Sequence, residues 1–385
     1  MLGIKAFLSS QAEAYVEEPK IDLQTPFAPT GGICKVLAMM KLHPPSPNSI
    51  IVPQSAFVLN SLLRCTSLTP SPVVCDWNNL MKLGYDPTTS SYIDAVGRCL
   101  GSDLRRLPLG AAPGTFAGTI PSGPLQNCDV YLGSTDSICA FIGALALAPP
   151  RGSGGADGLE GLAVTSLGTT LATKVVSSRR VFDGRRGVYS HLVPSTVLLD
   201  SSAASPARNV WLAGGASQAG CAVLRDLSFT DEELSRLSAT LDLTAPPTDP
   251  DLYPLPLGAR GERFPFVDAL AVSGVDEGKY GGSREGLLRD VLLGVAANVE
   301  LEGYKAIRDM GGPLVTRVVT TGGGARNEWW TEMRGRLLKG WLEEVGLEGV
   351  GEGVVSAADE AGDAALGAAA IAYRSHRNRR GEESS

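Results

Sequence analysis

One carboxylate of the sequence lies where it could take part in acid–base chemistry. Asp136 follows a short apolar strand that we predict over residues 129–132, and it precedes an apolar helix predicted over residues 137–147. A carboxylate at such a turn can accept a proton from a substrate hydroxyl while the hydroxyl oxygen attacks a phosphorus atom. It can also act simply as the N-cap of the helix, and the residues alone favour that simpler interpretation.

A glycine-containing turn over residues 166–170 could bind a phosphate group. Gly168 lets a ligand approach the backbone closely, and the successive N–H groups of a tight turn point the same way. The hydroxyls of Thr169 and Thr170 would add hydrogen-bond donors. An ordinary β-hairpin needs the same kind of turn, and taken alone the turn favours a hairpin without a ligand.

Three consecutive glycines form a second candidate for ligand binding. Gly322, Gly323 and Gly324 follow a strand predicted over residues 317–321 and precede a helix that begins near Asn327. The missing side chains leave room for a base or a phosphate, and the helix start adds N–H donors. The alternative is a tight strand-to-helix connection with Asn327 as the N-cap. The spacing matches neither GxGxxG nor GxxxxGK[ST], which argues against a Rossmann or P-loop site.

Gly214 and Gly215 suggest a third glycine turn between a strand and a helix. They end a strand-like segment over residues 210–214 and precede Ser217, whose hydroxyl suits a helix N-cap. This turn is a weak signal when taken alone. Its value is that several glycine turns at strand ends of one domain could converge on a single cleft.

The elements that must position these residues follow a proline- and glycine-rich connection over residues 149–158, where we place a domain boundary. Strand-like segments span residues 162–167, 170–176, 188–192, 210–214, 317–321 and 354–355. Helical segments start near Ser217 and span residues 285–304, with Ser283 as a possible cap, 327–345 and 362–373. Antiparallel strands followed by alternating helices and strands are the order of the ribonuclease-H-like half of actin-like ATPases, an analogy at the level of the fold.

The two ends of the chain are less regular than this middle part. Before residue 125, only short helices are predicted, over residues 35–42, 56–63 and 92–99, with proline-rich turns between them. At the other end, arginines cluster over residues 374–380. A short charged end of this kind is usually solvated, so we expect residues 376–385 to form a disordered tail.

Composition excludes several classes of function. The 385 residues are 43% apolar, which suggests two domains, each with its own core. The net charge of -7 provides no general attraction for nucleic acid or an anionic membrane. The 7 cysteines form no CxxC pair and the 3 histidines are far apart, which argues against a zinc site or a disulfide framework. The longest apolar run, over residues 138–148, is too short to span a bilayer, so we expect a soluble intracellular protein.

Taken together, the motifs resemble those of the FGGY carbohydrate kinases, in matching order and spacing over about residues 30–375. Four motifs carry the resemblance: GSTDS at 133–137, TSLGTT at 165–170, GGAS at 214–217 and TGGGARN at 321–327. Three further words resemble the plant and cyanobacterial branch of D-ribulose or xylulose kinase-like proteins: KLGYDP at 82–87, GVYSH at 187–191 and GERFP at 261–265.

The resemblance implies two ribonuclease-H-like, actin-like ATPase domains with a cleft between them, and phosphorylation of a sugar by ATP with Mg²⁺. Residues 1–150 would form a partial sugar-binding domain that carries Asp136 as general base, and residues 159–375 a complete nucleotide-binding domain. Gly168 and Thr169 would hold the β- and γ-phosphates, with Thr170, Gly214, Gly215 and Gly322 beside them. Gly323, Gly324 and Asn327 would line the adenosine site. No residue of this chain is implied as a metal ligand.

One motif of the family is missing from this sequence. The family begins with a D-x-G-T/S hairpin that organises Mg²⁺ and faces the transferred phosphate, and no such motif precedes Asp136. We therefore expect a kinase sequence that is truncated at its amino terminus and catalyses little as written. The alternatives are a non-catalytic relative that binds a nucleotide or a partner, and a purely structural protein on the same fold. The cytoplasm and the plastid both stay open as compartments.

Overall fold

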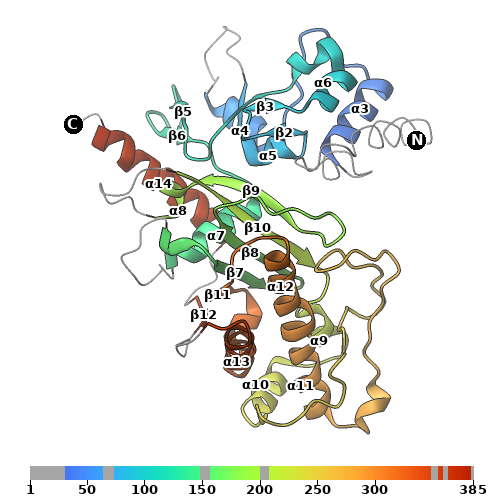
Figure 1. Cartoon of the computed structure of the whole chain (residues 1–385). Helices are drawn as coiled ribbons and strands as arrows, with labels where there is room; N and C mark the ends of the chain where they lie inside the picture. The colour runs from blue at the N-terminus through green and yellow to red at the C-terminus, as the bar shows by residue number, and fades with distance from the viewer. Residues whose placement is uncertain are drawn as a thin grey trace. The chain divides into compact units, whose positions relative to one another are not determined.

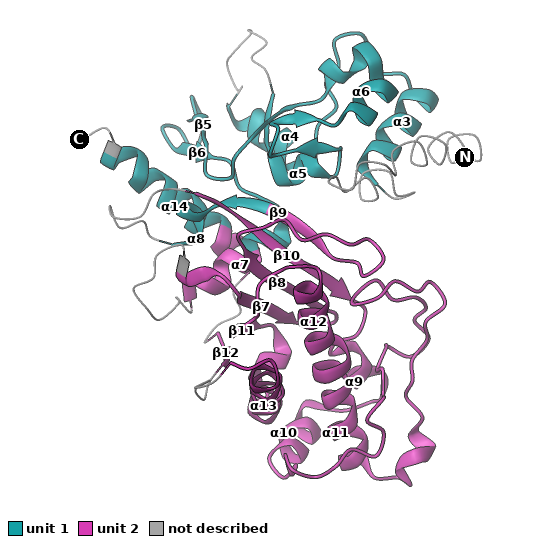
Figure 2. Ribbon diagram, in the orientation of Figure 1, with its two compact units in different colours: residues 1–139, 192–201, 368–385 teal, residues 140–191, 202–367 magenta. Residues whose placement is uncertain are grey.

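The computed structural model describes residues 31–63, 73–147, 157–199, 208–347, 354–358 and 363–382. Within them the chain forms two compact units (Figure 2). Unit 1 contains residues 1–139, 192–201 and 368–385, and unit 2 contains residues 140–191 and 202–367. The chain therefore crosses between the units more than once, and most of the connection predicted over residues 149–158 lies outside the described residues.

Unit 2 is built on a mixed sheet with the strand order β12-β11-β7-β8-β10-β9 (Figure 1). The strands are β7 (Leu162–Leu167), β8 (Leu171–Ser177), β9 (Tyr189–Pro194, whose last residues belong to unit 1), β10 (Asn209–Ser217), β11 (Arg317–Thr321) and β12 (Val355–Ala357). β8 pairs antiparallel with β7 and β10, whereas β11 runs parallel to both β7 and β12. The strand-like segments predicted after the proline- and glycine-rich connection thus all belong to this one sheet.

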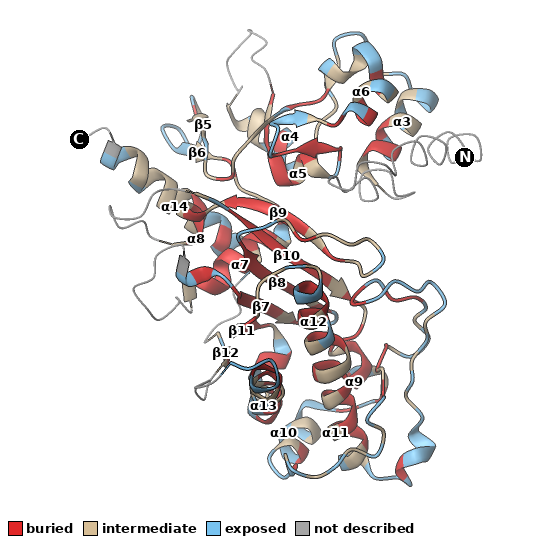
Figure 3. Ribbon diagram, in the orientation of Figure 1, coloured by how far each residue is buried: buried red, intermediate tan, exposed pale blue. Residues whose placement is uncertain are grey.

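The helices that follow β10 pack on this sheet and enclose its main apolar core. They are α9 (Ala222–Asp226), α10 (Asp231–Ser238), α11 (Arg284–Gly294), the π-helix η4 (Val295–Leu301), α12 (Glu302–Asp309) and α13 (Glu328–Glu344), with the short 3₁₀ turns η3 (Glu277–Tyr280) and η5 (Gly323–Arg326). Another 3₁₀ turn, η2 (Asp157–Leu159), precedes β7. The hydroxyl of Ser283 accepts a hydrogen bond from the N–H of Gly286 and caps α11, as predicted. Figure 3 shows the strands of the sheet largely buried, and the fully buried Trp330 of α13 belongs to the same core.

A long segment with little secondary structure, residues 239–276, packs on this core through several apolar side chains, among them Leu252, Leu255 and Phe264. Phe264 is fully buried between the backbones of β10 and α12. A Cβ atom at Gly215 in β10, or at Gly303 in α12, would collide with the ring of Phe264. The ring therefore fills a slot that exists because two separate elements carry glycine there.

Unit 1 consists of short elements. Its helices are α3 (Gly32–Leu42), α4 (Gln54–Leu63), α5 (Trp77–Met81), α6 (Asp94–Leu100), η1 (Gly101–Arg106) and α8 (Ser195–Leu198), and its strands pair as β1 (Val74–Asp76) with β4 (Leu109–Ala111), β2 (Tyr85–Asp86) with β3 (Ser91–Tyr92), and β5 (Phe116–Thr119) with β6 (Asp129–Tyr131). Two helices cross between the units: α7 (Asp136–Leu147) and α14 (Ala364–Glu382). The short helices predicted near residues 35–42, 56–63 and 92–99 are present, with ends shifted by a few residues.

Residues 376–382 differ from our prediction of a disordered tail over residues 376–385, while residues 383–385 lie outside the described residues. α14 continues as a helix to Glu382. His376 and Arg379 explain the difference, because both side chains contact Asp129 of β6, at 3.5 and 3.6 Å. These partners are remote in sequence, so the local cluster of charges did not reveal them.

The turn predicted at Gly214 and Gly215 is also wrong. β10 continues through both glycines to Ser217, and the next helix starts only at Ala222. Both glycines are buried in mid-strand, where a Cβ at Gly214 would collide with the carbonyl of Thr173 in β8. Ser217 does not cap a helix; its hydroxyl donates a 2.6 Å hydrogen bond to Glu262.

Candidate functional site

The predicted phosphate turn lies at one end of the unit 2 sheet, between β7 and β8. The N–H of Gly168 donates to the carbonyl of Thr170 over 3.2 Å, which closes the hairpin. Thr169 and Thr170 are exposed. A Cβ atom at Gly168 would have only one atom within 4 Å, the Thr170 carbonyl oxygen at 3.9 Å. The glycine therefore faces open space rather than a packing partner, as a backbone available to a ligand does.

The triple-glycine loop lies against this hairpin. β11 pairs in parallel with β7, with Thr321 opposite Ser166, so both strands end at the same edge of the sheet. Gly322 has a φ of +87°, and a Cβ there would lie 2.6 Å from the carbonyl oxygen of Leu167. Only glycine suits that position, because the backbone is left-handed and the neighbouring strand end is too close for a side chain.

The next two glycines of the loop differ from each other. Gly323 is exposed, and a Cβ there would meet nothing within 4 Å. Gly324 is buried, and a Cβ would lie 2.8 Å from both Leu167 and Trp330. Gly323 therefore presents open backbone, while Gly324 allows the loop to pack on the core.

A third segment, which the sequence did not single out, completes this edge. After β10, the carbonyl of Ala219 accepts a 2.7 Å hydrogen bond from the N–H of Leu171, and the N–H of Cys221 donates over 2.8 Å to the carbonyl of Gly168. Gly220 permits this approach, since a Cβ there would lie 2.8 Å from the carbonyl oxygen of Thr169. Three glycine segments thus meet at this edge of the sheet, and the third is Gly220 rather than the predicted Gly214 and Gly215.

Asn327 acts as the N-cap of α13. Its Oδ1 accepts a 2.9 Å hydrogen bond from the N–H of Trp330, and its Nδ2 donates over 2.7 Å to the hydroxyl of Ser238. The simpler interpretation of Asn327 is thereby confirmed, and the cap fixes where the helix starts after the glycine loop.

A buried carboxylate holds the strand end that leads to Gly220. Glu262 is 3% exposed, and its Oε2 accepts hydrogen bonds from the hydroxyls of Ser217 at 2.6 Å and Tyr253 at 2.9 Å. Its Oε1 accepts from the N–H groups of Gln218, at 3.0 Å, and Arg263. Burial, together with the charge of Glu262, raises the pKa of the Tyr253 hydroxyl well above its ordinary value. The GERFP segment noted in the sequence therefore stabilises the glycine site, because its Glu262 binds Ser217 and Gln218 just before Gly220.

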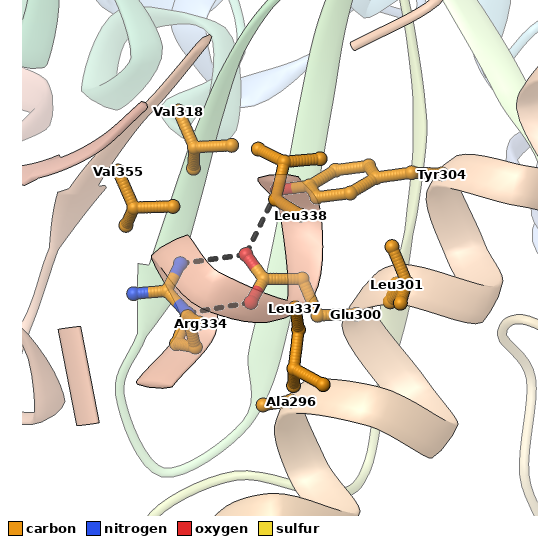
Figure 4. A pocket seen from close by; sticks show the side chains of 9 residues that line it. All are labelled: Ala296, Glu300, Leu301, Tyr304, Val318, Arg334, Leu337, Leu338 and Val355. Carbon is orange, nitrogen blue, oxygen red and sulfur yellow. Dashed lines mark hydrogen bonds and ion pairs between the residues drawn. The ribbon is translucent and has the colours of Figure 1, made fainter. Parts of the chain in front are cut away.

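A second buried network connects the two strands that carry the glycine turns. Figure 4 shows its centre, where Arg334 and Tyr304 meet Glu300. The guanidinium of Arg334 in α13 donates two hydrogen bonds of 2.6 Å to Glu300 in the π-helix, and a third of 2.8 Å to the hydroxyl of Thr320 in β11. Tyr304 donates to Glu300 over 2.8 Å, and its hydroxyl lies 2.6 Å from that of Thr165 in β7. A cavity of about 10 Å³ lies beside the pair, the size of about one water molecule.

Opposing effects set the charge of this network. Burial alone pushes the pKa of Glu300 up, but the charge of Arg334 and hydrogen bonds from Arg334, Thr165 and Tyr304 outweigh it, and the net pKa lies below the ordinary value. Glu300 is therefore ionised, and the network positions the ends of β7 and β11 through two threonine hydroxyls.

Asp136 lies in unit 1, at the first residue of α7. It is exposed, and its Oδ1 accepts a 2.7 Å hydrogen bond from the N–H of Ser137. The turn before it is held by Asn78, which is fully buried and donates over 3.0 Å both to the hydroxyl of Ser134 and to the carbonyl of Leu192. The carboxylate is thus exposed to solvent, next to a turn whose Ser134 hydroxyl is held by a buried amide.

Two classes of feature are absent from the parts of the chain that the structure describes. These residues contain no group of three or more histidine, cysteine, aspartate or glutamate side chains that could hold a metal ion. Among the same residues, no helix is both long enough and apolar enough to cross a bilayer.

The fold resembles solved carbohydrate kinases over almost the whole chain, although no protein-family model matches it. Ligand-bound xylulose kinase from Lactobacillus acidophilus superposes with a TM-score of 0.67 at 16% identity, and gluconate kinase from the same organism with 0.69 at 16%. In both cases the match covers 97% of this chain and 69% of the other. Glycerol kinase from Plasmodium falciparum with ADP gives 0.68 at 15% identity, with the same coverage. The chain thus has the actin-like ATPase fold, as predicted.

Proposed function

Because the chain has the fold of these solved carbohydrate kinases, we propose that it is an ATP-dependent carbohydrate kinase, which transfers the γ-phosphate of ATP to a sugar hydroxyl. The observation that carries this proposal is the meeting of the Gly168–Thr170 turn, the Gly322 loop and the Gly220 segment at one edge of the unit 2 sheet. Such an edge, with open glycine backbone and exposed hydroxyls, suits a nucleotide phosphate.

The proposed roles follow from what each residue contacts. Thr169 and Thr170 hold the β- and γ-phosphates through backbone N–H groups and hydroxyls, because both are exposed. Gly168 lets the phosphates approach the backbone, since no side chain obstructs it. Gly323 lets the adenosine lie against open backbone. Gly322, Gly324, Asn327, Gly214 and Gly215 act indirectly, because their close packing or capping fixes the loop and the strands.

Asp136 is the proposed general base. Its carboxylate is exposed, and a carboxylate has a second oxygen beyond the one that accepts from Ser137. A base of this kind takes the proton of the attacking sugar hydroxyl. Mg²⁺ would neutralise the phosphates when bound; because the described residues offer no cluster of ligands for it, we assign it no residue of this chain.

The proposed acceptor is a pentulose, D-ribulose or D-xylulose. Support comes from the branch-like words at residues 82–87, 187–191 and 261–265. Xylulose kinases from Lactobacillus acidophilus and Rhodospirillum rubrum are among the structures with this fold.

Nucleotide binding is tested by bulk added at Gly323. Gly323→Leu places a side chain in open space where the nucleotide would lie, so the fold should persist while the affinity for Mg-ATP or ADP falls about tenfold or more by calorimetry. Gly335→Leu is the matched control, since Gly335 of α13 also has no atom within 4 Å of its Cβ position. Equal affinity in the two variants would exclude the glycine edge as the nucleotide site.

Turnover is tested separately with Asp136→Asn and a panel of D-xylulose, D-ribulose, D-gluconate and glycerol. In a form of the protein that phosphorylates one of these sugars, Asp136→Asn should lower the rate by about 10²–10⁴-fold while nucleotide affinity is unchanged. Asp94→Asn is the control, because Asp94 is another exposed aspartate at the start of a unit 1 helix. Turnover by Asp136→Asn at the wild-type rate would refute its role as base, and nucleotide binding without phosphorylation of any sugar would favour a non-catalytic relative.

A further inference from the structure

The buried network around Glu300 contacts the elements on both sides of the triple-glycine loop. β11 ends at Thr321, just before the loop, and α13 begins at Glu328, just after it. Arg334 of α13 donates a 2.8 Å hydrogen bond to the hydroxyl of Thr320 in β11. These two residues are 3% and 0% exposed, so water does not compete for this bond. One hydrogen bond therefore joins the elements at the two ends of the loop.

The sheet alone does not fix the position of this loop. The pairing of β11 with β7 ends at Thr321 and Ser166, and Gly322 then takes a left-handed backbone with a φ of +87°. The N–H of Ala325 donates back to the carbonyl of Gly322, which shapes the loop without anchoring it to another element. The position of the loop relative to β7 therefore depends in part on where α13 starts, and the bond from Arg334 contributes to that.

Glu300 holds the Arg334 side chain in the orientation that this bond needs. The two hydrogen bonds from the guanidinium to the carboxylate are both 2.6 Å long. A bidentate pair of this kind fixes the plane of the guanidinium, and Nη1 then donates to Thr320. Glu300 lies in the π-helix η4, and π-turns within α-helices occur frequently at functional sites. Glu300 thus acts on the glycine loop through Arg334.

The same carboxylate also reaches the strand that carries the phosphate turn. Tyr304 donates over 2.8 Å to Glu300, and its hydroxyl oxygen lies 2.6 Å from that of Thr165. Thr165 lies in β7, shortly before Gly168, and directly opposite Thr320 in the parallel register of β7 and β11. The network therefore connects the supports of two turns that the proposed function assigns to different parts of ATP.

We propose that Arg334, Glu300 and Tyr304 are positioning residues for a ligand that spans both turns, a nucleoside diphosphate or triphosphate. This inference rests on the proposed function, in which the phosphates lie at the Gly168 turn and the adenosine at the Gly323 loop. Two contacts on one ligand reinforce each other only when the two sites have the spacing of the ligand. Loss of the network therefore weakens the binding of ADP, whereas adenosine, which contacts only one turn, keeps its affinity.

Calorimetry on the full chain with ADP and adenosine tests this proposal. Thr320→Val removes the hydroxyl that accepts from Arg334 and keeps the branched shape of the side chain. The affinity for ADP should fall about twofold to tenfold, the contribution of one hydrogen bond, while the affinity for adenosine should stay unchanged. Ser190→Ala is the control and should change neither affinity. Ser190 is also a buried hydroxyl of the sheet, but it bonds to Val181 and lies on β9, the edge strand remote from β7 and β11.

A second variant protects the test against unfolding, because Thr320→Val leaves a buried N–H of Arg334 without its acceptor. Thr165→Val breaks the contact with β7, whereas Tyr304 still donates to Glu300 and the buried charges keep their partners. It should weaken ADP binding and spare adenosine binding in the same way. A general loss of stability would affect both ligands alike, so the ratio of the two affinities reports on positioning.

The outcomes separate this inference from the proposed function. If the wild type binds no ADP, the nucleotide site and the positioning role both fail. If the wild type binds ADP and Gly323→Leu weakens that binding, the site stands. The positioning role alone is then overturned when both threonine variants keep the wild-type affinity for ADP, or lose affinity for ADP and adenosine by the same factor. Adenosine that fails to bind the wild type at millimolar concentration would also overturn it, because the glycine loop would then have no affinity of its own.

Discussion

The buried pair of Arg334 and Glu300 gives the sharpest prediction about stability. Their side chains are 2% and 5% exposed, so Arg334→Met would leave an ionised carboxylate in the core without its partner. Removing one member of a buried pair costs about 3–5 kcal/mol of unfolding free energy. Arg336→Gln is a matched control on the same helix, because its pair with Glu332 is exposed and contributes about 0.3–0.5 kcal/mol.

Urea denaturation followed by tryptophan fluorescence measures this difference. Trp211, Trp329, Trp330 and Trp341 lie in unit 2, and only Trp77 lies in unit 1, so the signal reports mainly on the unit that holds the pair. With a slope near the upper end of about 1–3 kcal/mol per molar urea, Arg334→Met should lower the midpoint by about 1–2 M. Arg336→Gln should lower it by less than about 0.5 M.

The pH dependence of the stability that Arg334→Met loses provides a second check. In the wild type the pKa of Glu300 is depressed, so its contribution is present above the unfolded pKa and is lost as pH falls through the folded pKa. In Arg334→Met only the hydrogen bonds from Thr165 and Tyr304 still oppose the effect of burial, which favours the protonated carboxyl, so the variant should gain stability as pH falls. The two curves should therefore converge on acidification. A midpoint for Arg334→Met equal to that of Arg336→Gln at neutral pH would refute the reasoning.

Two further predictions concern unit 2. Burial lowers the pKa of Lys174 to about 7, beside His191 at 3.5 Å and over the ring of Tyr189. The unfolded chain therefore binds more protons than the folded chain above pH 7, so the unfolding free energy should rise by up to about 1.4 kcal/mol per pH unit towards pH 9. Lys174→Met should remove this slope, whereas Lys339→Met, at an exposed ion pair, should keep it. Ser283→Ala should lower the unfolding free energy by about 0.5–2 kcal/mol because it removes the α11 cap. Ser235→Ala, in mid-α10, should lower it by less. Equal losses of stability in thermal unfolding would contradict the capping role.

The sequence predicted the sheet and most helices of unit 2 because their signals are local. The apolar spacing over residues 285–304 and the Ser283 cap located α11 and the π-helix after it, whereas α12 continues to Asp309, beyond the predicted end. The same spacing could not reveal the π-helical geometry of the segment after α11, because an inserted wide turn disturbs the apolar stripe very little.

The errors all involve partners that are distant in sequence. Ser217 has the residue type of a cap, but its hydroxyl bonds to Glu262, which no local pattern connects with it. Gly214 and Gly215 suggested a turn. Their lack of a side chain instead makes room for the Thr173 carbonyl of β8 beside Gly214 and for the ring of Phe264 beside Gly215. Gly220 could have been noticed as one more glycine after the strand, but its contact with the Thr169 carbonyl depends on β8 and β10 being neighbours.

The slot that holds Phe264 has a consequence for how this sequence can change. Gly215 in β10, Gly303 in α12 and Phe264 between them occupy one shared volume. A side chain gained at either glycine therefore requires a smaller residue at position 264, and a smaller residue at 264 alone would leave a void. We expect these three positions to vary together in distant relatives, so that their joint pattern would identify a relative even where overall identity is too low to do so.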